Sequence, residues 1–68
     1  MKKIRVYIEK YNTESEIEFN GETVKDLLSM LNLSPSRIIV IKNGYIVTED
    51  EKIEEKDYIK ILDAVSGG

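Results

Sequence analysis

The sequence predicts an α+β domain in which a mixed sheet of four to five strands packs on one α-helix. Three observations support this fold class. Apolar and polar residues alternate near both ends of the chain, which is the spacing of half-buried strands. Between these stretches, leucines recur at helical spacing. The expected order is ββαβββ, with one domain over residues 1–63 and a flexible tail over residues 64–68.

A β-hairpin is expected at the start of the chain. Ile4, Val6 and Ile8 fall on one face of the first strand, with charged or aromatic residues between them. The polar segment 10–14 is typical of a turn, and the following apolar residues alternate with glutamates. Two alternating runs joined by a short polar loop predict a hairpin with one apolar face.

The helix is expected over residues 23–31. Thr23 is a suitable N-cap, and Asp26 three residues later completes a capping box with Asp in place of the usual Glu or Gln. Asn32 can end the helix in a left-handed conformation, and Pro35 prevents its continuation. The apolar stripe of this helix consists of Val24, Leu27, Leu28 and Leu31.

The second half of the chain predicts three more strands. A continuous apolar run over residues 38–42 is typical of a central strand, and Asn43-Gly44 is a strong signal for a type I′ turn. A short returning strand follows the turn. Ile53 is an isolated apolar anchor in an acidic loop, and alternation resumes over residues 58–62 as the last strand.

This order of elements predicts a β-grasp domain, the ubiquitin-like fold. The helix must cover one face of the sheet to bury its leucines, which leaves the first and last strands free to lie side by side. The expected core consists of Ile4, Val6, Ile8, Ile17, Phe19, Val24, Leu27, Leu28, Leu31, Ile38, Val40, Ile59 and Ile61.

Composition excludes several classes of function. A chain of 68 residues has little room for a deep enzyme pocket, and it contains no cysteine or histidine. We therefore expect no catalytic residues and no metal site. The net charge of −3 argues against direct nucleic-acid binding. The longest apolar run, residues 38–41, is far shorter than the roughly 20 residues that span a bilayer, and no secretory signal is evident. We expect no membrane contact and a cytoplasmic location.

The C-terminal Gly67-Gly68 pair is the feature that carries chemistry. A free carboxylate is a poor electrophile and needs activation, usually as an acyl-adenylate made from ATP. Glycine has no Cβ, so it passes where a partner's channel approaches the backbone closely. Val65, Ser66 and Gly67 would thread this channel and bring the Gly68 carboxylate to the partner's active site.

Together these features resemble the ubiquitin-like sulfur-carrier superfamily. This superfamily includes thiamin-pathway sulfur carriers, the small subunit of molybdopterin synthase and small archaeal modifier proteins. The chain departs from it at Lys56, where the family often has glycine before the aspartate, and in a short 48–52 loop. The resemblance covers essentially the whole chain and rests on Gly21-Glu22-Thr23-Val24, Asp26-Leu27-Leu28, Val40-Ile41-Lys42-Asn43-Gly44, Ile46-Val47, Asp57 with Ile59 and Ile61, and Ala64-Val65-Ser66-Gly67-Gly68.

The resemblance implies a protein substrate or carrier, not an enzyme. An activating enzyme, which uses the ATP, would adenylate Gly68, and the chain itself would bind no cofactor. The adenylate would become a thiocarboxylate that donates sulfur to an acceptor enzyme for tRNA thiolation, molybdopterin or thiamin synthesis. Alternatively, Gly68 would form an isopeptide bond with a lysine of a target protein; Lys52 and Lys56 are possible acceptors if the chain modifies itself. We expect a monomer.

The sheet face opposite the helix is a candidate partner interface, because exposed apolar residues on a small domain often mark one. A competing hypothesis is an interaction module that binds through this face without any C-terminal chemistry. Removal of Gly68 distinguishes the two, because only the carrier requires it. The expected interface residues are Tyr7, Ile39, Ile41, Tyr58 and Leu62.

Overall fold

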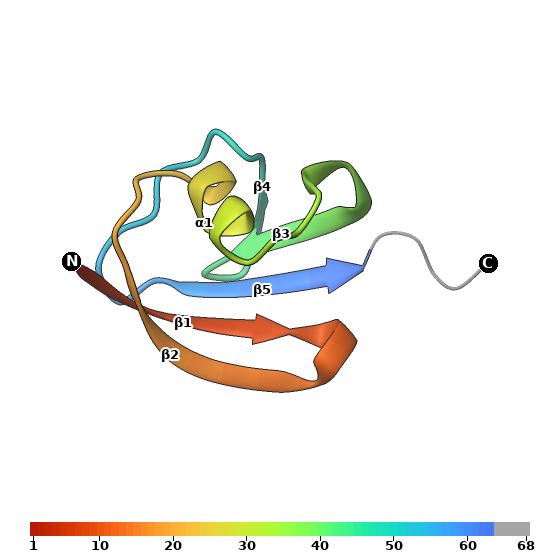
Figure 1. Ribbon diagram of the computed structural model, residues 1–68, viewed down its shortest axis with the longest axis horizontal. Helices are drawn as coiled ribbons and strands as arrows, with labels where there is room; N and C mark the ends of the chain where they lie inside the picture. Colours follow the sequence, from red (N-terminus) through yellow and green to blue (C-terminus); the bar gives the residue numbers. More distant parts are fainter. Residues whose placement is uncertain (64–68) are drawn as a thin grey trace.

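The computed structural model describes residues 1–63 and contains one α-helix and five strands in the expected order (Figure 1). Residues 64–68, predicted as a tail, lie outside the described residues. No helix within the described part of the chain is long and apolar enough to cross a membrane. Two short 3-10 helices accompany the main elements, which are β1 (Lys2–Ile8), η1 (Glu9–Tyr11), β2 (Thr13–Phe19), α1 (Val24–Met30), η2 (Pro35–Arg37), β3 (Ile38–Lys42), β4 (Tyr45–Val47) and β5 (Tyr58–Asp63).

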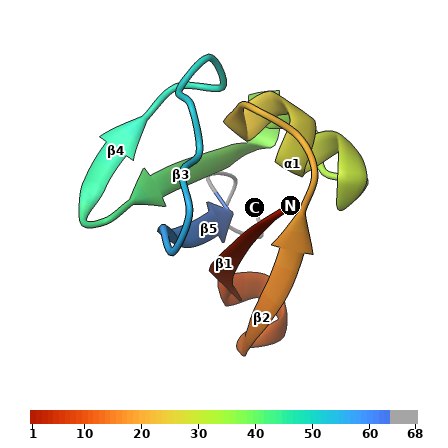
Figure 2. The same ribbon diagram turned by 90° about the vertical axis from the view of Figure 1, so that its left-hand side faces the viewer.

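The five strands form one mixed sheet in the order β2-β1-β5-β3-β4. β5 is the central strand; it is parallel to β1, and the other neighbouring strands are antiparallel. Figure 2 shows the sheet curling around α1, which lies against its concave face. The first and last strands therefore lie side by side, and the predicted β-grasp fold is confirmed.

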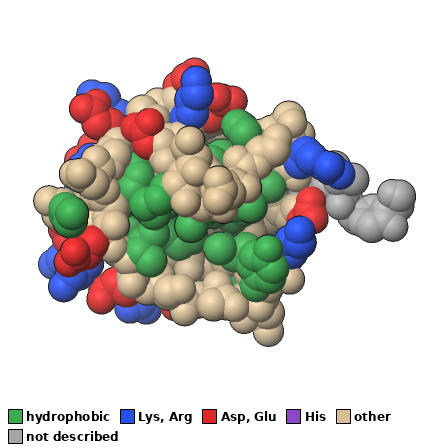
Figure 3. Space-filling model, in the orientation of Figure 1, with side chains coloured by type: hydrophobic (Ala, Val, Ile, Leu, Met, Phe, Trp, Pro, Cys, Tyr) green, Lys and Arg blue, Asp and Glu red, His purple; other side chains and the backbone are tan. Residues whose placement is uncertain are grey.

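The core lies between α1 and the concave face of the sheet. On the surface seen in Figure 3, apolar side chains gather in the middle, and charged side chains lie mainly toward the upper, left and right edges. Ile8, Ile17, Leu31 and Ile38, predicted as core, are only half-buried because they lie at the end of an element or on the edge strand β2. The buried apolar residues are Ile4, Val6, Phe19, Val24, Leu27, Leu28, Val40, Ile53, Ile59 and Ile61.

Ile53 is a full member of the core, although the sequence predicted it only as an isolated anchor. Its side chain is 0% exposed, and its N–H donates to the Glu22 carbonyl at 2.8 Å. The same loop provides carbonyls for the first turn of α1: Val24 N–H donates to Glu51 and Lys25 N–H to Glu49, each at 2.9 Å. The loop thus satisfies helix N–H groups that have no partner within the helix.

The predicted start of the helix is confirmed. Thr23 and Asp26 form the capping box, and Asp26 Oδ2 accepts N–H bonds from Glu22 at 2.9 Å and Thr23 at 3.2 Å. These two bonds stabilise the charged carboxylate and hold the pKa of Asp26 below its ordinary value. The cap fixes where the chain turns from the first hairpin into α1.

Within residues 1–63, four non-glycine residues adopt a left-handed backbone conformation. Asn43 (φ 51°) and Gly44 (φ 91°) form the predicted tight turn, and Asn32 (φ 58°) follows the helix as expected. The sequence did not predict Lys56, at φ 68°, in this conformation. The Cβ of a lysine disfavours a positive φ, whereas glycine has no Cβ and adopts it readily. A glycine before the aspartate would therefore suit this position better than Lys56 does.

Candidate interaction face

The convex face of the sheet, opposite α1, carries all five residues predicted as a partner interface. Strand alternation fixes this arrangement: Val6, Val40, Ile59 and Ile61 point into the core, so their neighbours point outward. The structure therefore brings these residues together, while their role in binding stays a prediction. The five residues are Tyr7, Ile39, Ile41, Tyr58 and Leu62.

The register divides this face into an apolar half and a charged half. Ile39 lies opposite Leu62, and Ile41 lies opposite Ile46. Ile39, Ile41, Ile46 and Leu62 form what we call the apolar patch, in which Ile39 is 38% exposed and Ile46 is 75% exposed. Exposing a contiguous group of apolar side chains to water is unfavourable in free energy. The patch is therefore suited to contact with another surface.

Ile46 was missed by the sequence prediction of the interface. A three-residue strand is too short for its alternation to show which side chains face outward. The Asn43-Gly44 turn contained the missing information, because a two-residue loop places Lys42 opposite Tyr45 and therefore Ile41 opposite Ile46.

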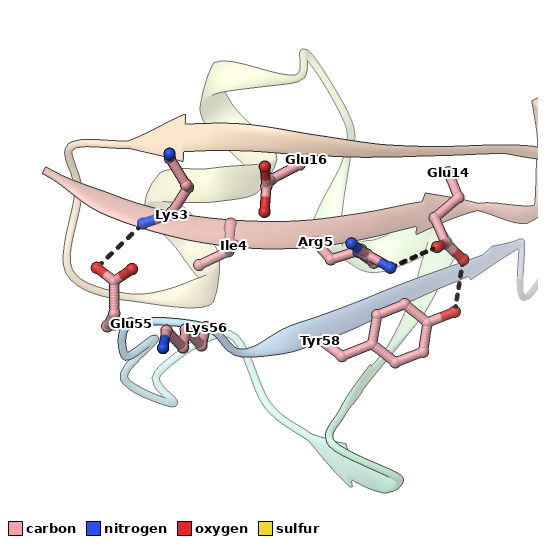
Figure 4. Close-up of a pocket in the computed structure, with 8 residues that line it drawn as sticks. All are labelled: Lys3, Ile4, Arg5, Glu14, Glu16, Glu55, Lys56 and Tyr58. Atoms are coloured by element: carbon pink, nitrogen blue, oxygen red, sulfur yellow. Dashed lines mark hydrogen bonds and ion pairs between the residues drawn. The ribbon is translucent and has the colours of Figure 1, made fainter.

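The charged half lies on β1 and β2. Arg5 Nη1 lies 3.4 Å from Glu14 Oε2, and the Tyr58 hydroxyl donates to Glu14 Oε1 at 3.1 Å (Figure 4). The Tyr7 hydroxyl donates to Asn12 Oδ1 at 3.0 Å. Both tyrosines thus direct their hydroxyls toward polar partners.

The environment of Tyr58 favours its neutral form. Partial desolvation of the hydroxyl is the main cause of a raised Tyr58 pKa, and the bond to the Glu14 carboxylate adds to it. The hydroxyl is therefore kept as a hydrogen-bond donor. It borders a hollow whose lining residues are Lys3, Ile4, Arg5, Glu14, Glu16, Glu55, Lys56 and Tyr58 (Figure 4).

The apolar patch extends to the end of β5 from which the last five residues continue. Leu62 precedes Asp63, the last described residue, and lies directly opposite Ile39. A partner that covers the patch is therefore adjacent to the start of the C-terminal segment. The residues predicted for threading and activation, Val65, Ser66, Gly67 and Gly68, lie outside the described residues.

The two predicted acceptor lysines lie away from the patch. Lys52 and Lys56 are both exposed, in the loop between β4 and β5. Lys52 forms an isolated bridge with Thr23, and the backbone N–H of Lys56 donates to the Lys3 carbonyl at 2.7 Å. Among residues 1–63, no group of acidic side chains is arranged to hold a metal ion.

Comparison with known proteins agrees with this architecture. The model of the ThiS family matches residues 4–68. The sulfur carrier protein TtuB of Thermus thermophilus is 28% identical over 54 residues, which is 78% of this chain and 83% of TtuB. The crystal structure of SAMP1 from Haloferax volcanii superposes with a TM-score of 0.71 at 18% identity, over 97% of this chain and 99% of SAMP1.

These findings define the class of protein as a ubiquitin-like β-grasp domain of the sulfur-carrier type. The chain belongs to the ThiS family. The resemblance predicted from the sequence is therefore confirmed at the level of family and fold.

Proposed function

We propose that this sulfur carrier acts through the carboxylate of Gly68, which an activating enzyme adenylates and converts to a thiocarboxylate. The observation that supports this proposal best is the position of the apolar patch. The patch borders the end of the strand that leads to Gly67-Gly68, and the family match includes these residues. One docking event can thus secure the domain and deliver the terminus.

The chain supplies the acyl group and the partner supplies the catalysis. A Gly68 carboxylate oxygen attacks the α-phosphate of ATP bound to the activating enzyme, and pyrophosphate leaves. Hydrosulfide, or an equivalent sulfide-level donor supplied by the partner, then attacks the acyl carbon; the C–S bond of the thiocarboxylate forms, and AMP leaves with the electron pair of the broken C–O bond while the donor's proton is lost. Gly67 and Gly68 let the backbone pass a narrow channel because neither carries a side chain.

The convex face has the composition of a recognition surface. Its apolar half lies on β3, β4 and the end of β5, its charged half lies on β1 and β2, and Tyr7 and Tyr58 lie between the two halves. We assign to Tyr7, Ile39, Ile41, Tyr58 and Leu62, together with Ile46, the docking of the activating enzyme.

The activated terminus has two possible chemical fates. As a thiocarboxylate it donates sulfur to an acceptor enzyme, in tRNA thiolation, molybdopterin synthesis or thiamin synthesis. As an acyl donor it forms an isopeptide bond with a lysine of a target protein. Exposed Lys52 and Lys56 are the acceptors that we propose if the chain modifies itself. A monomeric state and a cytoplasmic location remain predictions from the sequence.

A Gly68 deletion tests the proposal. The full chain is incubated with the adenylating enzyme encoded in the same genome, and ATP–pyrophosphate exchange is measured. We expect exchange with the full chain and none with the deletion, while both proteins have the same thermal unfolding midpoint. Binding of the enzyme without any exchange by the full chain would instead support the interaction module.

A further inference from the structure

Lys60 lies at the centre of the convex face, surrounded by the residues of the proposed docking surface. It is directly opposite Ile41 on one neighbouring strand and Tyr7 on the other. Tyr58 and Leu62 precede and follow it at the two-residue spacing that places them on the same face. Lys60 is half-buried, so its aliphatic stem contributes to this surface.

The Lys60 ammonium has no ionic or hydrogen-bonding partner within residues 1–63. Two other cations are paired, since Arg5 lies 3.4 Å from Glu14 and Lys42 lies 2.9 Å from Glu51. What distinguishes Lys60 from the other lysines without an ion pair is its place among Tyr7, Ile41 and Leu62. Glu14 is separated from Lys60 by Tyr7 in the cross-strand row and already binds Arg5 and the Tyr58 hydroxyl. In the free protein, the Lys60 ammonium is therefore hydrated by water.

Docking on this face removes that water. A purely apolar partner surface would leave the ammonium buried and unpaired, which strongly opposes association. A partner carboxylate opposite Lys60 replaces the hydrogen bonds that the ammonium loses when water leaves. An apolar surface without such a carboxylate binds more weakly, so Lys60 discriminates against it. The structure therefore favours a partner surface that is apolar with one acidic side chain near its centre.

A second copy of this chain does not meet this requirement. In a two-fold symmetric pair, the same patch lies on both sides of the interface. A face-to-face pair centred on Lys60 would bring two like charges together, which is unfavourable. The occupant must be a different molecule.

We propose that Lys60 is a specificity-determining residue, and that the adenylating enzyme docks on it with an apolar surface containing a central carboxylate. This inference rests on the proposed function, because that function identifies the partner. Lys60 thereby selects for an acidic group on the partner, because its cross-strand neighbours are Tyr7 and Ile41 and its same-face neighbours along β5 are Tyr58 and Leu62.

The test compares three single-lysine variants of the full chain. Lys60→Met keeps the length of the side chain and removes the charge, and Lys60→Arg keeps the charge. Lys25→Met removes the same charge from the exposed helix surface and is the matched control. The affinity for the adenylating enzyme and the ATP–pyrophosphate exchange are measured for each, with thermal unfolding as the check on folding.

We expect Lys60→Met to bind at least about 10-fold more weakly, because the partner's carboxylate is left unpaired. Lys60→Arg should remain close to the parent chain, and Lys25→Met should be unchanged. Equal or tighter binding of Lys60→Met would overturn the inference, since removing an unpaired charge improves an apolar contact. Equal weakening by Lys25→Met would overturn it too, because the effect would be general electrostatics. Absence of exchange with the parent chain would overturn the proposed function itself.

Discussion

Asn43 Nδ2 donates to Asp57 Oδ1 at 2.9 Å and thereby joins the β3–β4 turn to the start of β5. Asn43 Oδ1 also accepts the Tyr58 N–H at 2.9 Å, and Asp57 Oδ2 accepts the Glu54 N–H at 2.7 Å. Asp57 is only 7% exposed, and the Asn43 amide and the Glu54 N–H, with Lys42 Nζ at 3.8 Å, replace the water that its carboxylate loses on burial. The network fixes the beginning of the strand that leads to the C-terminal segment.

Replacement of Asn43 by glycine should destabilise the domain. Asn43→Gly preserves the positive φ but removes one donor to buried Asp57 and the acceptor of the Tyr58 N–H. We expect a loss of about 1–3 kcal/mol in the free energy of unfolding, measured by urea denaturation. Asn12→Gly is the control, since Asn12 also has a positive φ and the bond that its side chain accepts from the Tyr7 hydroxyl is exposed to solvent; it should change stability by less than about 0.5 kcal/mol. Equal effects at both positions would refute the role of the network.

Lys56→Gly should stabilise the domain. Lys56 is exposed and held at φ 68°, a conformation that costs a non-glycine residue about 1–2 kcal/mol. After the greater chain entropy of glycine is subtracted, we expect a net gain of about 0.5–1 kcal/mol in urea denaturation. Lys52→Gly removes a lysine from the same loop without a positive φ to relieve, so it should give no gain. A loss of stability in Lys56→Gly would show that strain at this residue is absent.

The capping box formed by Asp26 should make the stability of the domain depend on pH in the acidic range. The pKa of Asp26 is lowered from 3.8 because the Glu22 and Thr23 N–H groups bind its charged form. A lowered folded-state pKa means that this stabilisation is complete above pH 3.8 and is lost as the pH falls through the folded-state value. Asp26→Asn should therefore be less stable than the parent chain at neutral pH, and thermal unfolding should show the difference shrink in acid. A difference that stays constant in acid contradicts this assignment.

Two adjacent residues of β4 allow a controlled test of the apolar patch. Ile46 and Tyr45 are almost equally exposed, at 75% and 76%, but they point to opposite faces of the sheet. We expect Ile46→Asp to weaken binding of the adenylating enzyme by at least about 10-fold and Tyr45→Asp to have little effect. Both variants should keep the parent unfolding midpoint. A larger effect of Tyr45→Asp than of Ile46→Asp would show that the enzyme binds the opposite face of the sheet and not the convex face.

The sequence predicted the elements of the fold because each had a local signal. Alternation marked β1, β2 and β5, leucine spacing marked α1, and the Asn43-Gly44 pair marked the β3–β4 turn. The complete burial of Ile53 had no such signal, since a lone apolar residue in an acidic loop has no periodicity. Its burial follows from the loop crossing the start of α1, which is a tertiary relationship.

The candidate face was predictable in part for the same reason. Strand alternation placed Tyr7, Tyr58 and Leu62 outward, but Ile46 required the register of the turn. The sequence predicted that β5 lies beside β1, but the central position of Lys60 also required the pairing of β5 with β3, which only the assembled sheet provides. The alternation of residues along a strand predicts which face of the sheet each side chain points to. Which side chains from other strands lie next to it on that face depends on the order of the strands in the sheet.

The central claim, that Gly68 is the activated group, is tested most directly by intact-mass spectrometry of the chain purified from its native host. The account predicts a species heavier by the difference between one sulfur and one oxygen atom, with the increase confined to the C-terminal peptide. A Gly-Gly remnant on target lysines in the same extract would identify conjugation as a further fate of Gly68. If neither species is found while the adenylating enzyme is active in those cells, the C-terminal chemistry proposed for this chain is wrong.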